Sequence, residues 1–134
     1  MKVLVDTSVW SLALRRNAPS AVSKKLTELI LASQVVMIGP VRQELLSGIS
    51  DEQTFLNLKY KLEPFDDLPL TTYDHETAAR FFNICRSHGV PGSHTDFLIC
   101  AIAANNDLLI FTTDQDFYRF AKFLPIRLFE SRIK

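Results

Sequence analysis

Short apolar runs separated by long helical segments constrain the fold of this chain more than any other feature. Three of these runs cover residues 2–6, 35–38 and 108–112, and residues 126–129 form a candidate fourth. Because their apolar residues are continuous rather than alternating, the runs are typical of strands buried on both faces, as in parallel sheets. The pattern therefore predicts an α/β sandwich around a mostly parallel sheet of four to five strands.

The segments between the runs carry helix signals. Apolar residues recur at helical spacing, Pro40 suits the first turn of a helix, and Gly48 suits its end. Residues 62–72 contain two prolines and are expected to form an irregular connection with a short extended piece. With 134 residues and neither a linker nor a repeat, the chain is expected to be one domain, residues 1–134. Helices are predicted at residues 9–14, 22–30, 41–47, 51–62, 73–88 and 96–105.

No stretch of the sequence suits a membrane span or a disulfide framework. The longest uncharged stretch, residues 29–41, has thirteen residues, whereas a bilayer span needs roughly twenty. The acidic Asp6 comes too early for a secretory apolar segment. Cys85 and Cys100 are too few for a disulfide framework, so we interpret both as reduced thiols. These features predict a cytoplasmic protein with no membrane partner.

Five carboxylates occupy positions that a core-forming pattern does not favour. Asp6 ends the first apolar run, and Asp114 and Asp116 follow the third. Glu44 lies in the helix after the second run, and Asp96 leads into the most apolar helix. These positions make the five acids candidates for a functional site.

Each of these acids also has a structural explanation when it is taken alone. Asp6 can cap the helix that follows it, and Glu44 can be a solvated residue on a helix surface. Ser93 and Asp96 have the spacing of a capping box, in which a hydroxyl and an acid three residues later satisfy the first turn. The two acids after the third run can be turn residues.

Taken together, the acids favour a cation site. The carboxyl ends of parallel strands meet at one edge of the sheet, and ligands bind in the crevice outside that edge. Clustered carboxylates repel one another unless a cation neutralises them, and oxygen ligands suit Mg²⁺ or Mn²⁺. Such a cation can bind a phosphate oxygen, activate water and stabilise a leaving oxygen. The pattern therefore indicates metal-assisted hydrolysis of a phosphodiester.

The overall charge does not exclude a nucleic acid. Fifteen basic and fifteen acidic residues give a net charge of zero, which alone argues weakly against such a partner. If cations offset the five clustered acids, ten acids and fifteen bases remain elsewhere. Residues 1–50 carry six bases and three acids, and residues 117–134 carry five bases and one acid. Candidate RNA contacts are Arg15, Arg16, Lys24, Lys25, Arg42, Arg86 and Arg119.

Four segments of the sequence, in this order, resemble those of PIN-domain nucleases. They are Val5–Trp10 (VDTSVW), Gly39–Gly48 (GPVRQELLSG), Thr95–Ala103 (TDFLICAIA) and Thr113–Phe117 (TDQDF). Each segment alone is a weak motif, but four in register are fairly specific. The resemblance is strongest to VapC-type toxins of bacterial toxin–antitoxin pairs, and it extends from residue 3 to about residue 129.

The resemblance also implies site residues. Its acidic metal ligands correspond to Asp6, Glu44 and Asp96, with Asp114 at the fourth acidic position. Asp116 is expected to support the site, although the spacing leaves open which of the last two acids is the fourth ligand. A hydroxyl of Thr7 or Ser8 matches the position that contacts the metal-bound water or an acid.

The function implied by the resemblance is that of a metal-dependent endoribonuclease, with Mg²⁺ or Mn²⁺ as cofactor. Such an enzyme would cleave single-stranded regions of RNA as the toxin of a type II toxin–antitoxin pair, form a homodimer and bind a small antitoxin. Two alternatives remain open at this point. One is a PIN-like module that binds RNA or protein without cutting, although the intact set of acids counts against it. The other is a PIN nuclease with a processing or repair role outside toxin–antitoxin systems.

Overall fold

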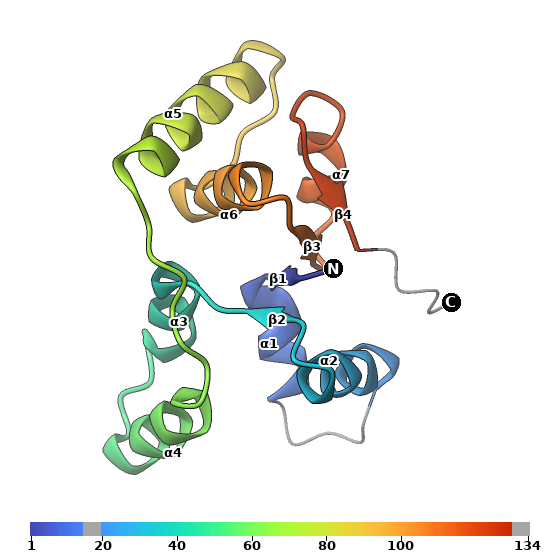
Figure 1. The fold of residues 1–134 in the computed structure, drawn as a ribbon. Helices are drawn as coiled ribbons and strands as arrows, with labels where there is room; N and C mark the ends of the chain where they lie inside the picture. The colour runs from blue at the N-terminus through green and yellow to red at the C-terminus, as the bar shows by residue number, and fades with distance from the viewer. Residues whose placement is uncertain (15–19, 130–134) are drawn as a thin grey trace.

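A parallel sheet between layers of helices forms the architecture of the chain, in a computed structural model that describes residues 1–14 and 20–129 (Figure 1). Within these residues, four strands lie in the order β2-β1-β3-β4, and each neighbouring pair is parallel. The strands are β1 (Val3–Val5), β2 (Val35–Val36), β3 (Leu109–Phe111) and β4 (Arg127–Leu128). The predicted α/β fold class is therefore confirmed.

The described residues form seven helices, which pack on both sides of the sheet. They are α1 (Thr7–Ala13), α2 (Ala21–Leu31), α3 (Gly39–Leu46), α4 (Glu52–Leu62), α5 (Thr72–Ser87), α6 (His94–Asn105) and α7 (Asp116–Phe120). In Figure 1, α5 and α6 lie above the sheet, α1 and α2 lie below it, and α3 and α4 extend to its left. None of the described helices has the length and apolar character needed to cross a bilayer.

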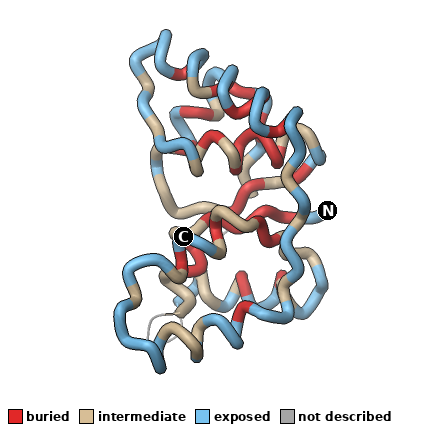
Figure 2. The backbone as a smooth tube through the Cα atoms, turned by 90° about the vertical axis from the view of Figure 1, so that its left-hand side faces the viewer, coloured by how far each residue is buried: buried red, intermediate tan, exposed pale blue. Residues whose placement is uncertain are grey.

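The core lies around β1 and α6. All three residues of β1 are buried, with Leu4 paired in register to Val36 on one side and Ile110 on the other. Helix α6 is apolar on nearly every side because it is enclosed between the sheet and α5, and burial is concentrated between these layers (Figure 2). Cys85 and Cys100 are both buried free thiols, and burial raises the pKa of each. The structure thus contains no disulfide between them.

Several local predictions also hold. Helix α3 has Pro40 in its first turn, and Gly48 follows its end with φ of 85°, a conformation that glycine adopts readily. The connection after α4 is irregular, and its short extended piece makes a parallel bridge between Met37 and Asp67. Helix α7 is not predicted from the sequence, because five residues are too few to show a helical period.

Candidate active site

The carboxyl ends of β1 and β3 bring two of the predicted acids together. Asp6 directly follows β1, and its amide donates a hydrogen bond of 2.9 Å to the Phe111 carbonyl at the end of β3. Asp114 lies three residues beyond β3. Because β1 and β3 are adjacent and parallel, these two acids lie at the same edge of the sheet.

Helices α3 and α6 supply the other acids of the same cleft. Glu44 lies on α3, which follows β2, and Asp96 lies in the first turn of α6. A cleft of about 520 Å³ opens between these elements. Its walls include four carboxylates and several hydroxyls, contributed by Asp6, Thr7, Ser8, Glu44, Ser47, Thr95, Asp96 and Asp114. The fold therefore gathers six of the seven predicted site residues around one cleft.

Asp6 is held by two hydroxyl groups rather than serving as a helix cap. It occupies the position before α1, but its side chain makes no capping hydrogen bond there. Instead its Oδ2 accepts hydrogen bonds from Ser8 Oγ at 2.7 Å and Thr112 Oγ1 at 2.8 Å. The side chain is 5% exposed, and no described residue donates a hydrogen bond to its Oδ1. This arrangement fixes the carboxylate and leaves one oxygen available for a ligand.

The same two hydroxyls join the start of α1 to the loop after β3. Ser8 Oγ accepts the Thr113 amide at 3.0 Å, and Thr112 Oγ1 accepts the Asp114 amide at 3.0 Å. Thr112 therefore links Asp6 and Asp114, the acids at the ends of neighbouring strands. Thr112 is not among the site residues predicted from the sequence, although its place at the end of the third apolar run is the signal that could have identified it.

Thr7 connects α1 to Glu44. Its hydroxyl donates a hydrogen bond of 2.6 Å to Glu44 Oε1. Glu44 is exposed, so without this contact its long side chain would be free to sample many rotamers. The contact holds the Glu44 carboxylate at the wall of the cleft.

Asp96 both caps α6 and faces the other acids. Its Oδ2 accepts the Ser93 amide at 3.1 Å, while Ser93 Oγ accepts the Asp96 amide at 3.0 Å, which confirms the predicted capping box. Burial raises the pKa of Asp96, and the charges of Asp6 and Asp114 raise it further against the opposing effect of Ser93. A bound cation would relieve this repulsion.

Asp116 lies outside the cleft. Its amide donates a hydrogen bond of 2.9 Å to Asp114 Oδ1, and its carboxylate forms an ion pair with Arg119. Asp116 thus lies behind Asp114 at the start of α7, while Asp114 lines the cleft.

The donor set fits a hard divalent cation. All four cleft acids offer carboxylate oxygens, which Mg²⁺ and Mn²⁺ prefer, and Mg²⁺ commonly binds through one or two carboxylates and keeps several waters. Among residues 1–14 and 20–129, no three His, Cys, Asp or Glu side chains are close enough to enclose one ion directly. Asp6, Glu44, Asp96 and Asp114 are the residues that could hold such a cation.

Arg42, a predicted RNA contact, has a structural role instead. Its Nε contacts Asp67 Oδ1 at 3.1 Å, its Nη1 donates to the Leu62 carbonyl at 3.0 Å, and its Nη2 donates to the Phe65 carbonyl. The guanidinium therefore fastens the irregular connection after α4 to α3. Residues two apart on a helix point in directions about 200° apart, so the nearness of Arg42 to Glu44 in sequence did not place it in the cleft.

The other predicted RNA contacts differ in their surroundings. Lys25 lies 3.7 Å from Glu28, and Arg119 is paired with Asp116. Lys24 and Arg86 form no ion pair with any described residue. Arg15 and Arg16 lie outside the described residues.

Comparisons with known proteins agree with this fold. The family model for the PIN domain matches residues 3–123. Ribonuclease VapC11 of Mycobacterium tuberculosis is 30% identical to the chain over 120 residues, which cover 86% of this chain and 88% of that protein.

Solved structures show the same architecture. FitAcB from Neisseria gonorrhoeae superposes with a TM-score of 0.78 at 25% identity and covers 96% of both chains. VapBC2 from Rickettsia felis, solved with a DNA fragment from its promoter, gives a TM-score of 0.75 at 17% identity, over 97% of this chain and 98% of that one. The second likeness concerns the fold alone. From the family match and the identity to VapC11, this chain belongs to the PIN-domain family and groups within it with the VapC ribonucleases.

Proposed function

We propose that this protein is a metal-dependent endoribonuclease that cleaves single-stranded regions of RNA and acts as the toxin of a type II toxin–antitoxin pair. One observation carries the proposal: four carboxylates from β1, α3, α6 and the loop after β3 line a single cleft at the carboxyl edge of the sheet. Its resemblance to VapC11, a ribonuclease by name, supports the same activity.

In this proposal Asp6, Glu44, Asp96 and Asp114 hold Mg²⁺ or Mn²⁺. A bound cation would supply Lewis-acid chemistry toward the phosphate and toward the water that acts as nucleophile. No histidine lines the cleft, so no imidazole of the described residues is placed there as a general base. The acids of the cleft cannot bind a polyanion by themselves, and cleavage is therefore expected to require the cation.

The hydroxyls position the acids. Ser8 and Thr112 orient Asp6 through its Oδ2, and Thr7 orients Glu44. Groups that fix the orientation of a metal ligand contribute to affinity and activity even when they do not touch the metal. Asp116 supports the site through Asp114, whose Oδ1 accepts the Asp116 amide.

The proposal includes partners. Because the similar solved structures include VapBC complexes, such as the VapBC2 structure, we propose that a small antitoxin protein binds and inhibits this chain. A homodimer, a single PIN-like domain over residues 1–134 and a cytoplasmic location, where RNA is available, belong to the same proposal. The family match over residues 3–123 is consistent with one such domain.

The proposal is tested with purified protein and matched nucleic acids. Wild type should cleave single-stranded RNA in Mg²⁺ or Mn²⁺, with little cleavage of the same sequence as duplex RNA or as DNA, and EDTA should stop the reaction. Asp96→Asn should remove activity, because the amide keeps the shape of the carboxylate and loses its charge. Asp66→Asn, an exposed acid away from the cleft, is the matched control and should behave as wild type.

Other outcomes distinguish the alternatives. Cleavage that persists in EDTA, or in Asp96→Asn, would contradict the proposed site. RNA binding without cleavage, together with no Mn²⁺ binding by calorimetry, would favour a module that does not cut. Equal cleavage of structured RNA or DNA would favour a processing or repair role.

A further inference from the structure

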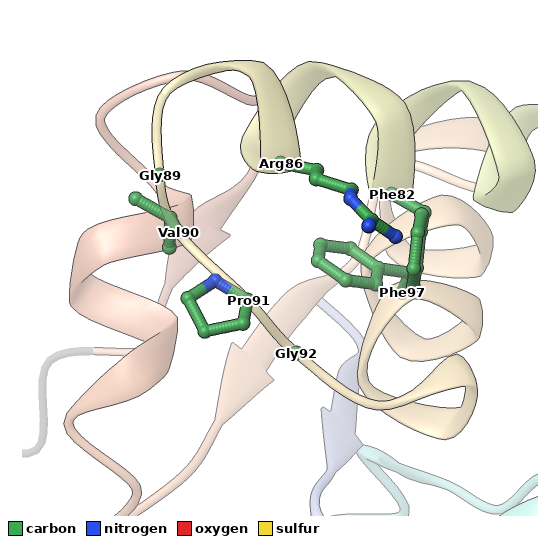
Figure 3. Close-up of a pocket in the computed structure, with 7 residues that line it drawn as sticks. All are labelled: Phe82, Arg86, Gly89, Val90, Pro91, Gly92 and Phe97. Carbon is green, nitrogen blue, oxygen red and sulfur yellow. The ribbon is translucent and has the colours of Figure 1, made fainter.

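A second hollow lies at the end of α5 and the start of α6. It has a volume of about 350 Å³ and is lined by side chains of α5 and α6 and by the loop 89–92 that joins them (Figure 3). The half-buried ring of Phe82 is its accessible aromatic wall, with the buried Phe97 behind it. Pro91 and Gly92 form its loop side, and Arg86 lies at its edge. We call it the Arg86 pocket.

The walls of the Arg86 pocket are fixed by close packing. The rings of Phe82 and Phe97 meet edge to face, with centroids 5.5 Å apart and planes at 72°. Gly92 lies so close to Phe97 and Phe120 that a Cβ at this position would be 2.6 Å from Phe120 Cζ and 2.9 Å from Phe97 Cε2. A larger residue cannot occupy position 92 without moving these rings, so the loop side of the pocket is packed closely against the core.

Arg86 gives the Arg86 pocket an available positive charge. Its side chain is exposed and, within the described part of the chain, makes neither an ion pair nor a hydrogen bond. In Figure 3 it extends from α5 toward Phe82 and Phe97. A guanidinium beside aromatic rings offers a phosphate-binding group next to a stacking surface, which is the combination that binds a nucleotide of a single strand.

The Arg86 pocket is connected to the catalytic cleft by the start of α6. Gly92 precedes Ser93, which caps the helix and bonds to Asp96. On the other side of Phe82, His94 stacks on its ring with centroids 5.4 Å apart and planes at 16°. A further hollow of about 430 Å³ includes Phe82, His94 and Phe97, and His94 adjoins the Thr95–Asp96 wall of the cleft.

We propose, on the basis of the ribonuclease function proposed above, that the Arg86 pocket binds one nucleotide of the single-stranded RNA next to the cleaved position. The base lies against the half-buried ring of Phe82, and Arg86 binds a phosphate of the same strand. The strand passes around the start of α6, over His94, between the cleft and the pocket. Duplex RNA does not fit this arrangement, because its bases are paired and stacked and cannot enter the pocket.

The test measures RNA binding in the Asp96→Asn protein, in which cleavage is expected to be lost. A fluorescein-labelled single-stranded RNA of about 12 nucleotides and mixed sequence serves as the probe, read by anisotropy. Adding Arg86→Gln should raise the Kd about 3- to 10-fold, as expected for loss of a phosphate and stacking contact. Arg80→Gln, an exposed residue on another face of α5 that does not line the pocket, is the matched control and should leave the Kd unchanged.

A second measurement asks whether a base occupies the pocket. Phe82→Leu should raise the Kd for the intact RNA. If the ring stacks on a base, removing that base from the RNA removes the same interaction. Phe82→Leu should then no longer change the Kd for an RNA that lacks the base at that one position. Thermal melts show whether Phe82→Leu remains folded, and Arg86→Gln, a change at an exposed side chain, tests the proposal independently.

The outcomes separate this proposal from the one on which it rests. If the Asp96→Asn protein binds no RNA, the Arg86 pocket is contradicted, and if the wild-type protein also fails to cleave RNA in Mn²⁺, the ribonuclease function is contradicted as well. If the Asp96→Asn protein binds RNA with the same Kd with and without Arg86, only the Arg86 pocket is contradicted. An Arg86→Gln variant that binds RNA normally but loses self-association would show that the pocket is a protein interface, and would also overturn the proposal.

Discussion

Helices α5 and α6 begin with the same capping motif, yet their aspartates differ in surroundings. Thr71 and Asp74 form the capping box of α5, and Ser93 and Asp96 form that of α6. The other oxygen of Asp74 accepts a hydrogen bond of 2.8 Å from Asn105 Nδ2, and the residue is 4% exposed. Asp96 has no such donor among the described residues and lines the acidic cleft.

The pKa values of the Asp74 and Asp96 carboxyl groups shift in opposite directions. Burial tends to raise the pKa of Asp74, but hydrogen bonds from Asn105 and Thr71 outweigh it, and the pKa is lowered. Burial raises the pKa of Asp96, and the neighbouring acids Asp6 and Asp114 add to the rise. The same capping box can therefore belong to a structural aspartate in α5 and to a candidate site residue in α6. The groups around each aspartate distinguish the two roles.

The largest difference that we expect between Asp96 and Asp74 is in the rate of RNA cleavage. Asp96→Asn should reduce RNA cleavage by more than about 100-fold, since losing even an outer partner of a metal ligand costs 10- to 100-fold. Asp74→Asn should cleave at nearly the wild-type rate, because Asp74 does not line the cleft. Initial rates on one labelled RNA measure both variants. If both variants lost cleavage activity equally, the proposed functional difference between Asp96 and Asp74 would be contradicted.

The next effect concerns the support of Asp6. Thr112→Val removes a hydroxyl that donates to Asp6 Oδ2 and accepts the Asp114 amide, and should lower cleavage about 10- to 100-fold. Thr112→Ser should restore most of the activity. If Thr112→Val weakens Mn²⁺ binding in calorimetry as well as cleavage, the hydroxyl acts by orienting the ligand. Unchanged cleavage in Thr112→Val would show that Asp6 needs no such support.

The third prediction concerns the stability of the fold, which should depend more on Asp74 than on Asp96. Asp74→Ala leaves Asn105 and the Thr71 amide without their acceptor, and should lower the free energy of unfolding by about 1.5–3 kcal/mol. Urea denaturation followed by circular dichroism measures the change. A loss of stability in Asp96→Asn as large as that in Asp74→Ala would mean that the two capping boxes are equivalent.

The smallest effect is the pH dependence in EDTA. A lowered pKa means that the charge of Asp74 stabilises the fold above about pH 3.9, and that this contribution is lost as the pH falls through the lower folded value. The raised pKa of Asp96 has the opposite sign, so its charge destabilises the fold at neutral pH. Without metal, Asp96→Asn should therefore gain about 0.5 kcal/mol at pH 7, whereas Asp74→Asn should lose stability. Urea titrations at pH 7 and near pH 3.5 should show both differences shrinking at the lower pH. A loss of stability in Asp96→Asn at pH 7 would contradict the sign.

The sequence predicted the sheet and most of the helices because these follow from local patterns. Continuous apolar runs identified β1, β2 and β3, and Pro40 and Gly48 identified the limits of α3. The short helix α7 was not predicted because its five residues show no periodic pattern. Its start is instead marked by the hydrogen bond from the Asp116 amide to Asp114 Oδ1. The capping box of Asp96 was visible in the sequence, but its charged surroundings come from residues far along the chain.

The candidate site was predicted less completely, for the same reason. Thr112 contacts Asp6, which is 106 positions away, so no local pattern joins them. Arg42 was one of the basic residues predicted to contact RNA, yet its side chain pairs with Asp67 instead. Strand order decides which acids meet, and that order depends on the packing of the whole chain.

The central claim, that the cleft acids form one divalent-cation site, is tested most directly by titrating Mn²⁺ into metal-free protein in a calorimeter. Wild type and Asp66→Asn should bind Mn²⁺ alike, and Asp96→Asn should bind it at least about 10-fold more weakly. Equal Mn²⁺ affinity in wild type and Asp96→Asn would contradict the claim.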